Sequence, residues 1–172
     1  ATVKILDKTV IVSQPADATI TYGENATFTV TANGTALYYQ WRRHVNNTVH
    51  NVGTDSSSFI ITTPLVADSG STYDVVVSGS GGSVTSRVAV LRVNRAVLTV
   101  TADNKIRPYG LANTTFTSHY DGFVNGEDPS VISGAPGFST PATIGSPVSG
   151  SLYPIIPSIG DSIFTILRAA NY

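Results

Sequence analysis

The chain has 172 residues, of which 41% are hydrophobic and only 12% are charged, against roughly 25% charged residues in typical soluble domains. The formal net charge is −1 and the ten Lys and Arg residues are scattered, so no basic patch can neutralise nucleic-acid phosphates. The absence of Cys excludes a disulfide framework, a thiolate metal site and a cysteine nucleophile. No apolar run approaches the roughly 18 residues of a membrane-spanning helix. We therefore expect no nucleic-acid partner and no membrane span in this chain.

The residue types favour β-structure over helix. Glu occurs only twice, whereas Thr, Val, Ser and Gly are abundant, and β-branched residues are typical of strands. We predict an all-β protein. The internal pattern divides it into residues 1–9, a linker or the end of a preceding module, and two domains at residues 10–94 and 95–172. Because Met is absent and the chain starts at Ala1, we expect a piece of a longer exported polypeptide.

Residues 10–94 contain short β-forming runs at the spacing of a sandwich, separated by turn-forming Gly, Asn, Asp and Ser. Ala26, Phe28 and Val30 share one face, and the intervening Thr residues share the other. This alternation is typical of a half-buried antiparallel strand. The predicted strands begin at Val10 and continue through residues 26–32, 37–43, 58–64, 72–79 and 83–93.

Three features of this domain resemble a cysteine-free immunoglobulin-like domain. Trp41 follows Val30 by eleven residues, which is similar to the spacing between the first bridging Cys and the buried Trp of that family. Val30 and Val75 stand where the two Cys would be. Tyr73, two residues before Val75, resembles the family's tyrosine corner. The resemblance implies a β-sandwich in which Trp41 and Tyr73 are core residues and not ligand contacts.

The second domain is rich in Pro and Gly, with a predicted strand in residues 96–110 that ends in a Pro-Tyr-Gly turn and a predicted helical turn at Pro129. It resembles the bacterial repeat module called the MBG domain of YGX type. The resemblance implies a small β-grasp-like sheet that lacks its last strand after Tyr172 and has an exposed edge. The matching stretches are LTVTADNKIRPYG (98–110), LANTTF (111–116), YDGFVNGED (120–128), SGAPGFST (133–140) and Ala170-Asn171-Tyr172.

The sequence motifs that could support catalysis or metal binding are incomplete. Gly160-Asp161-Ser162 is similar to the start of one esterase family, but no His follows Ser162 to act as its base. Calcium prefers oxygen ligands, and four acidic residues could supply them: Asp103, Asp121, Glu127 and Asp128. Because no Asp-rich calcium loop is present, we expect these acids to be solvated residues of turns. We predict no catalytic, cofactor-binding or metal-binding residues, and no cofactor.

Aromatic residues are the remaining candidates for recognition. Tyr38, Tyr109, Tyr120 and Phe123 are candidate ligand contacts, since aromatic rings stack on sugar rings or on peptide side chains. The alternative interpretation is that each ring covers its own strand or turn.

The sequence predicts a non-catalytic, extracellular module pair of a bacterial surface protein of the adhesin type, acting as a stalk or spacer or in cell adhesion. One alternative is that the pair itself recognises a glycan or a matrix protein. Another is an accessory region of a secreted carbohydrate-active enzyme. The expected partners are neighbouring modules of the same chain and, for a recognition module, a glycan or protein on another surface.

Overall fold

The computed structural model describes residues 1–46, 48–149, 152–158 and 170–172. Within these residues the regular elements are strands, apart from two short 3-10 turns at Val66–Asp68 (η1) and Pro129–Val131 (η2). The predicted all-β class is confirmed. The chain divides into two compact units, residues 1–95 and residues 96–170 with Tyr172, which we call the first and the second unit.

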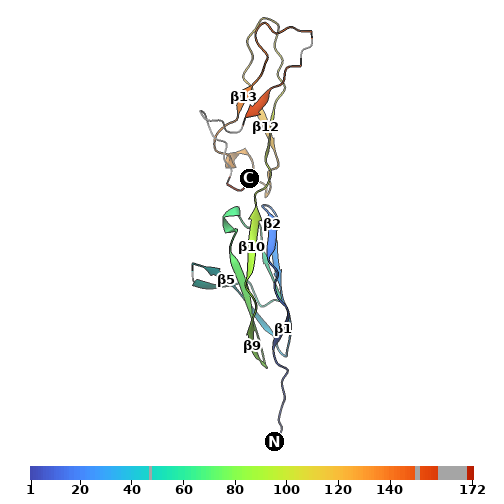
Figure 1. The fold of residues 1–172 in the computed structure, drawn as a ribbon, viewed down its shortest axis with the longest axis vertical. Coiled ribbons are helices and arrows are strands. Elements are labelled where there is room, and N and C mark those ends of the chain that lie inside the picture. Colours follow the sequence, from blue (N-terminus) through green and yellow to red (C-terminus); the bar gives the residue numbers. More distant parts are fainter. Residues whose placement is uncertain (47, 150–151, 159–169) are drawn as a thin grey trace. The chain divides into compact units, whose positions relative to one another are not determined.

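The strands of the first unit form a sandwich with an immunoglobulin-like order. One sheet runs β2-β10-β8-β5-β6, with β9 paired to β8, while β3 pairs with β7 and β1 with β4 (Figure 1). The pairing of β2 with β10 is parallel and the others are antiparallel. The strands are Val10–Ser13 (β1), Ala18–Thr21 (β2), Ala26–Thr29 (β3), Thr31–Asn33 (β4), Tyr38–Val45 (β5), Thr48–Val52 (β6), Ser58–Ile61 (β7), Thr72–Gly79 (β8), Gly82–Thr85 (β9) and Ala89–Asn94 (β10).

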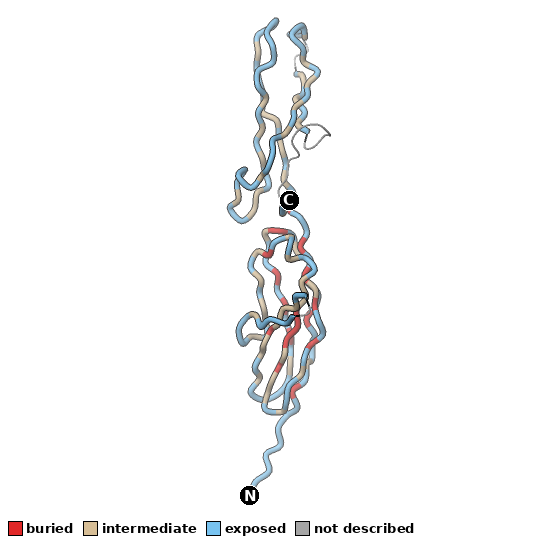
Figure 2. The backbone as a smooth tube through the Cα atoms, turned by 90° about the vertical axis from the view of Figure 1, so that its left-hand side faces the viewer, coloured by how far each residue is buried: buried red, intermediate tan, exposed pale blue. Residues whose placement is uncertain are grey.

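The core of this unit is aromatic. The ring centroids of Phe28 and Tyr73 lie 5.1 Å apart, and those of Trp41 and Phe59 lie 5.9 Å apart. Trp41 pairs directly with Val75 across β5 and β8. Its buried indole N–H donates to the Ser56 carbonyl at 2.9 Å, so the one polar group of the Trp41 side chain is satisfied. The core positions predicted for Trp41 and Tyr73 are those observed, and Figure 2 shows the buried residues of this unit.

The strand predicted at residues 83–93 is in fact two strands, β9 and β10, and this prediction was wrong. The chain leaves the ladder at residues 86–88. Ser86 makes the break stable because its hydroxyl accepts from the Val75 amide at 3.0 Å and donates to the Arg87 carbonyl at 2.8 Å. The Ser86 amide still donates to the Val75 carbonyl at 2.9 Å, so the buried hydroxyl replaces only the return bond of this rung.

Sequence reasoning missed β2 and β6. The chain changes sheets between β1 and β2 at the buried Pro15, which cannot donate to a ladder. The flanking side chains of Gln14 and Asp17 accept from the amides of Arg87 and Val90, at 2.8 and 3.2 Å. Strand β6 is exposed at four of its five residues, so it has no apolar alternation to detect.

Residues 1–9 form no strand, but their last part packs against residues 79–81 of the same unit. A Cβ at Gly81 would lie 2.0 Å from the Asp7 carbonyl oxygen, and one at Gly79 would lie 2.7 Å from the Thr9 hydroxyl. Thr9 is buried. The two glycines therefore allow a close approach of the incoming backbone that no other residue permits.

The second unit contains two separate antiparallel pairs in its described residues. Thr99–Ala102 (β11) pairs with Ser118–Asp121 (β12), and Gly137–Ser139 (β13) pairs with Ile156–Ser158 (β14). The strand predicted for residues 96–110 ends at Ala102, because the following stretch through Pro108 forms no ladder. The helical turn predicted at Pro129 is η2.

Burial differs strongly between the units. Among the described residues of the second unit only Ala96 is buried, whereas the first unit holds the whole aromatic core (Figure 2). Several large apolar side chains of the second unit are exposed instead, including Ile106, Leu111 and Leu152. Such side chains are available for contact with a ligand or another chain.

Candidate functional site

The aromatic residues predicted as ligand contacts do not form one patch. Tyr38 lies on β5 of the first unit and is 49% exposed, whereas Tyr109 is 67% exposed and lines a cavity of the second unit. Tyr120 and Phe123 are close together, with ring centroids 6.3 Å apart. Phe123 also meets Tyr172 edge-on at 5.9 Å, so these rings stabilise their own unit. Of these four residues, Tyr109 lines the cavity of the second unit.

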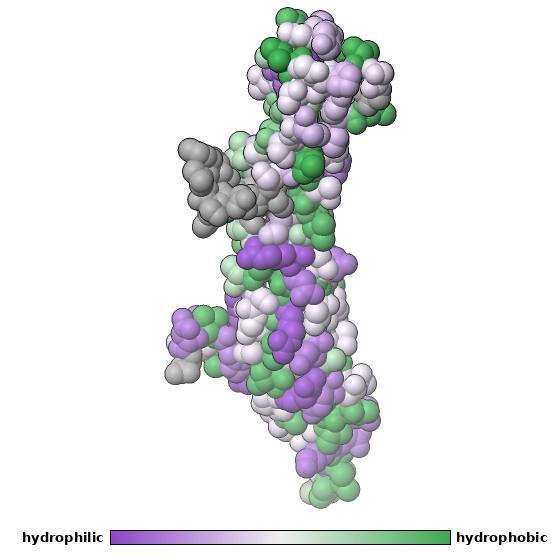
Figure 3. Space-filling model, turned by 45° about the horizontal axis from the view of Figure 1, so that its top comes forward, coloured by the Kyte–Doolittle hydropathy of each residue, from purple (hydrophilic) through white to green (hydrophobic). Residues whose placement is uncertain are grey.

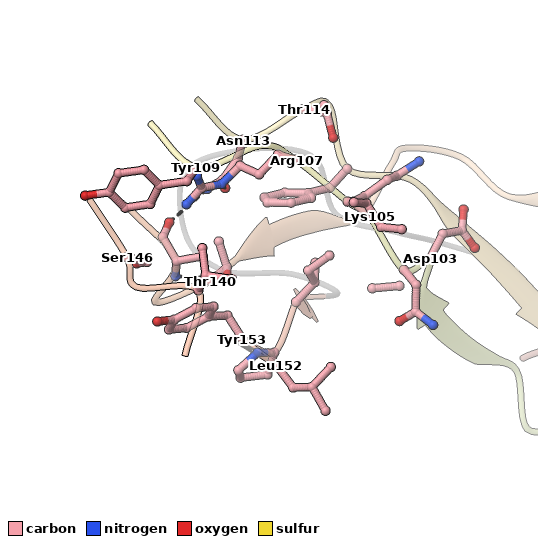
Figure 4. A pocket seen from close by; sticks show the side chains of 18 of the residues that line it. Asp103, Lys105, Arg107, Tyr109, Asn113, Thr114, Thr140, Ser146, Leu152 and Tyr153 are labelled. Atoms are coloured by element: carbon pink, nitrogen blue, oxygen red, sulfur yellow. Dashed lines mark hydrogen bonds between the residues drawn. The ribbon is translucent and has the colours of Figure 1, made fainter. Parts of the chain in front are cut away.

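The cavity of the second unit has a volume of about 790 Å³ and lies between two stretches without regular structure (Figure 4). One wall is formed by residues 102–116, after β11, and the other by residues 140–148 and 152–155, before β14. Tyr109, Phe116 and Tyr153 contribute aromatic rings to the lining. A volume of this size suits a small organic ligand, for which sites of roughly 300–1,000 Å³ are usual.

Arg107 connects the two walls. Its Nε donates to the Asn113 side-chain oxygen at 2.8 Å, and Nη1 donates to the Leu111 carbonyl at 3.0 Å. Its Nη2 donates to the Thr143 carbonyl of the opposite wall. The Asn113 amide donates in turn to the Ala142 carbonyl at 2.9 Å. We call this network the Arg107 clamp; it fixes the spacing of the walls and uses most of the guanidinium's donors.

The base of the cavity is apolar and its rim carries a tyrosine hydroxyl. Phe116 packs against Phe138 of β13, with ring centroids 6.0 Å apart. The Tyr153 hydroxyl donates to the Pro147 carbonyl at 3.2 Å, which orients the Tyr153 ring along the wall. In Figure 4 Tyr109 and Tyr153 lie at one end of the cavity, and Asp103 and Lys105 lie at the other.

The charges at the second end are paired. The Asp103 carboxylate lies 2.8 Å from Nδ1 of His119 and accepts from the Thr117 hydroxyl. These hydrogen bonds, first that from Thr117 and then that from His119, lower the pKa of Asp103. The hydrogen bond to Asp103 raises the pKa of His119, whose Nε2 lies 3.7 Å from Asp121. His119 is therefore held between the carboxylate of Asp103, which follows β11, and that of Asp121 on β12.

The remaining acids act separately. The Asp128 side chain accepts from the Ser130 amide at 2.8 Å, which caps η2 and lowers the pKa of Asp128. Glu127 accepts from the Tyr172 hydroxyl at 2.6 Å. Thus the four acids considered for calcium are not brought together, and the described residues contain no group of three or more His, Asp or Glu placed to hold a metal ion. Ser162 of the esterase-like motif lies outside the described residues.

The first unit holds a polar cluster around Asp74 that sequence reasoning missed. Asp74 faces outward on β8, yet its side chain is only 5% exposed. Arg42 covers it from β5 with two hydrogen bonds, Nε to Oδ1 at 2.7 Å and Nη2 to Oδ2 at 2.6 Å. The bond to Asp74 raises the pKa of Arg42. His44 Nε2 lies 3.1 Å from the same carboxylate. The pairing of Arg42 with Asp74 could be found only once the strand register was known.

Comparisons with known proteins give different results for the two units. The family model of the MBG domain (YGX type) matches residues 98–172. No curated protein matches the chain. Part of the chain is similar to a titin Z1Z2 chimera functionalised with an exogenous decorin peptide, at 20% identity, 53% coverage of this chain, 98% of that chain and a TM-score of 0.42.

Two further solved structures are similar at the same level. Rst D1-D2 is 19% identical over 55% of this chain and 54% of that chain, with a TM-score of 0.43. The immunoglobulin domains 1–5 of Sidekick-1 are 15% identical over 74% of this chain and 26% of that chain, with a TM-score of 0.42.

The assignment of the first unit therefore comes from its own strand order and register, with the buried Trp41 on β5 opposite Val75 on β8. In the described part of the chain no helix is long and apolar enough to cross a membrane. Residues 98–172 are an MBG domain of YGX type, and they follow an immunoglobulin-like β-sandwich.

Proposed function

We propose that the chain is a non-catalytic module pair of an exported bacterial surface protein, and that it acts as a spacer in an adhesin-type polypeptide. Modules of the immunoglobulin-like and MBG kinds are typical of surface or extracellular proteins and are generally non-catalytic. The observation that carries the proposal is the succession of these two modules within 172 residues. Serial β-modules extend a chain without needing any chemistry of their own.

The use of polar side chains supports this proposal. Arg42 and Asp74 are paired with each other, Arg107 binds the walls of its own unit, and Asp128 caps a turn. A catalytic site instead keeps a nucleophile, an acid or a base directed at the place where a substrate binds. The charged groups named here stabilise the fold that holds them.

The experiment exchanges residues 1–172 in the full-length protein for an unrelated β-sandwich pair of the same length, and measures adhesion of the cells that display it. A spacer predicts that adhesion is retained, because only length and rigidity matter. A matched deletion of the same residues shortens the polypeptide and is expected to reduce adhesion. Loss of adhesion in the exchange variant, with surface display unchanged, would contradict the spacer role.

A second candidate function is recognition by the second unit, and the cavity lined by Tyr109 and Tyr153 favours it. A pure spacer needs no cavity of about 790 Å³ with clamped walls. The two functions are compatible, since a module can both extend a polypeptide and bind a ligand along it.

A further inference from the structure

We infer that the cavity of the second unit binds a neutral oligosaccharide whose sugar rings stack on Tyr109 and Tyr153. The inference deepens the recognition function proposed above and does not depend on the spacer role. It assigns the ligand contact to the cavity and removes Tyr38, Tyr120 and Phe123 from the candidate contacts, because none of these three lines it.

The aromatic end of the cavity offers rings that are free to stack. Tyr109 is 67% exposed, and within the described residues no hydrogen bond holds its hydroxyl. Tyr153 is held by its bond to the Pro147 carbonyl, so its ring is presented in one orientation. A pyranose has an apolar face of C–H groups that packs on such rings and a rim of hydroxyl groups that needs polar partners.

Polar side chains of the right kind line the same cavity. Asn104, Thr114, Thr140 and Ser146 are uncharged donors and acceptors among its lining residues. Figure 4 shows Ser146 and Thr140 near the two tyrosines. Groups that both donate and accept match sugar hydroxyl groups, which do the same.

The charges around the cavity favour a neutral ligand. Arg107 is directed at four acceptors of its own walls, so it is not available as an anion receptor. Asp103 is paired with His119 and Thr117, and Lys105 lies close enough to lower the Asp103 pKa further. The charged lining residues are two cations, Lys105 and Arg107, and one anion, Asp103. With the guanidinium bound to its own walls and the carboxylate paired, the cavity offers a charged ligand little net attraction.

The Arg107 clamp lowers the cost of binding. Both walls are stretches without regular structure, and such stretches would otherwise lose conformational freedom when they close on a ligand. The clamp fixes their separation in the free protein through Asn113 and the Thr143 carbonyl. Ile106, which lines the cavity, is 93% exposed and widens the surface for an extended ligand. Figure 3 shows apolar side chains, in green, at one end of the second unit.

The test is a binding titration of the whole 172-residue chain, followed by NMR, against defined probes. The neutral probes are maltotetraose, cellotetraose and lacto-N-tetraose. The charged probes are sialyllactose and a heparin tetrasaccharide, and a proline-rich decapeptide represents a protein ligand. We expect saturable binding of at least one neutral oligosaccharide, with a dissociation constant of about 1 mM or below.

The variants locate the binding. Tyr109→Ala and Tyr153→Ala are expected to weaken the neutral probe about tenfold, because each removes one stacking ring. Tyr109→Phe keeps the ring and is expected to bind within about twofold of the unchanged chain. Tyr38→Ala, a tyrosine of similar exposure in the first unit, is the matched control and is expected to have no effect. The amide spectrum of each variant reports whether the second unit is folded.

Three results would overturn the inference. The first is that none of the neutral probes binds detectably at concentrations up to about 10 mM. The second is binding restricted to the anionic sugars or to the peptide. The third is binding that Tyr109→Ala and Tyr153→Ala leave unchanged in folded variants. Because the spacer role is tested by module exchange on cells, either proposal can fail while the other stands.

Discussion

The ion pair on the outer face of the first unit gives the sharpest stability prediction. The Asp74 side chain is 5% exposed and that of Arg42 is 27% exposed. Arg42→Met leaves the buried carboxylate without its main partner, and breaking a buried pair in this way costs about 3–5 kcal/mol. Asp74→Asn leaves the more exposed guanidinium, which can turn to water, so we expect a loss of about 1–2 kcal/mol. Both variants lose the same ion pair, so the difference between their losses of stability comes from how deeply the remaining charge is buried.

The assay uses the only Trp of the chain. Trp41 lies in the core of the first unit, so its fluorescence during urea unfolding follows that unit and not the second. The free energies of unfolding are compared between variants that share the same m-value, the slope of that free energy against urea concentration. Arg92→Met, at an exposed position of β10, is the control and is expected to change stability by less than about 0.5 kcal/mol. Equal losses for Arg42→Met and Asp74→Asn, or a larger loss for Asp74→Asn, would refute the reasoning.

Three further predictions concern packing, charge and the cavity walls. Gly81→Ala lowers the stability of the first unit by about 1–3 kcal/mol, because its Cβ would lie 2.0 Å from the Asp7 carbonyl, and an unchanged thermal midpoint would contradict this. The raised pKa of His119 means that its bond to Asp103 stabilises the fold below a pH of about 6.5 and is lost as the pH rises through the raised value. The lowered pKa of Asp103 acts in the opposite sense, as its contribution is present above about 3.8 and is lost as the pH falls through the lowered value. Asp103→Asn should lower the His119 pKa in an NMR titration, and an unchanged pKa would contradict the pairing. Arg107→Lys keeps the charge but cannot bridge the walls, so amide hydrogen exchange in residues 103–117 should accelerate; unchanged protection would mean that the clamp does not hold them.

The sandwich could be predicted because the residues that face its core alternate with polar residues along the sequence. The alternation of Phe28 and Val30 with Thr residues, and the spacing of Trp41, Tyr73 and Val75, all appear in the core that the structure has. Apolar and polar residues alternate along these strands because each strand has one face in the core and one in water. The same logic fails for β6, which is exposed at nearly every residue and so carries no pattern.

The partners of charged side chains could not be predicted in the same way. The alternation of β8 puts Asp74 on the face opposite Tyr73 and Val75, but the burial of Asp74 depends on the register that sets it beside Arg42, 32 residues earlier. A long-range register is decided by the packing of whole strands and not by local pattern. The break at Ser86 is a similar case, because its hydroxyl replaces a backbone bond that the local sequence favours.

The second unit was predicted from resemblance more than from periodicity. The motif residues Tyr109 and Asn113 were identified, and the family match at residues 98–172 confirms the module. The cavity and the role of Arg107 were not foreseen, because both walls are irregular and are joined by side-chain hydrogen bonds to carbonyl groups. A lone Arg before a Pro-Tyr-Gly turn is the one signal that precedes them.

Surface accessibility on intact cells tests the account most directly. Antibodies raised against the 172-residue chain are applied to living cells of the source organism, with and without prior treatment by an external protease. A surface module pair predicts strong labelling of intact cells that the protease removes, while an intracellular marker stays unlabelled. Labelling that appears only after the cells are lysed would contradict the proposed function.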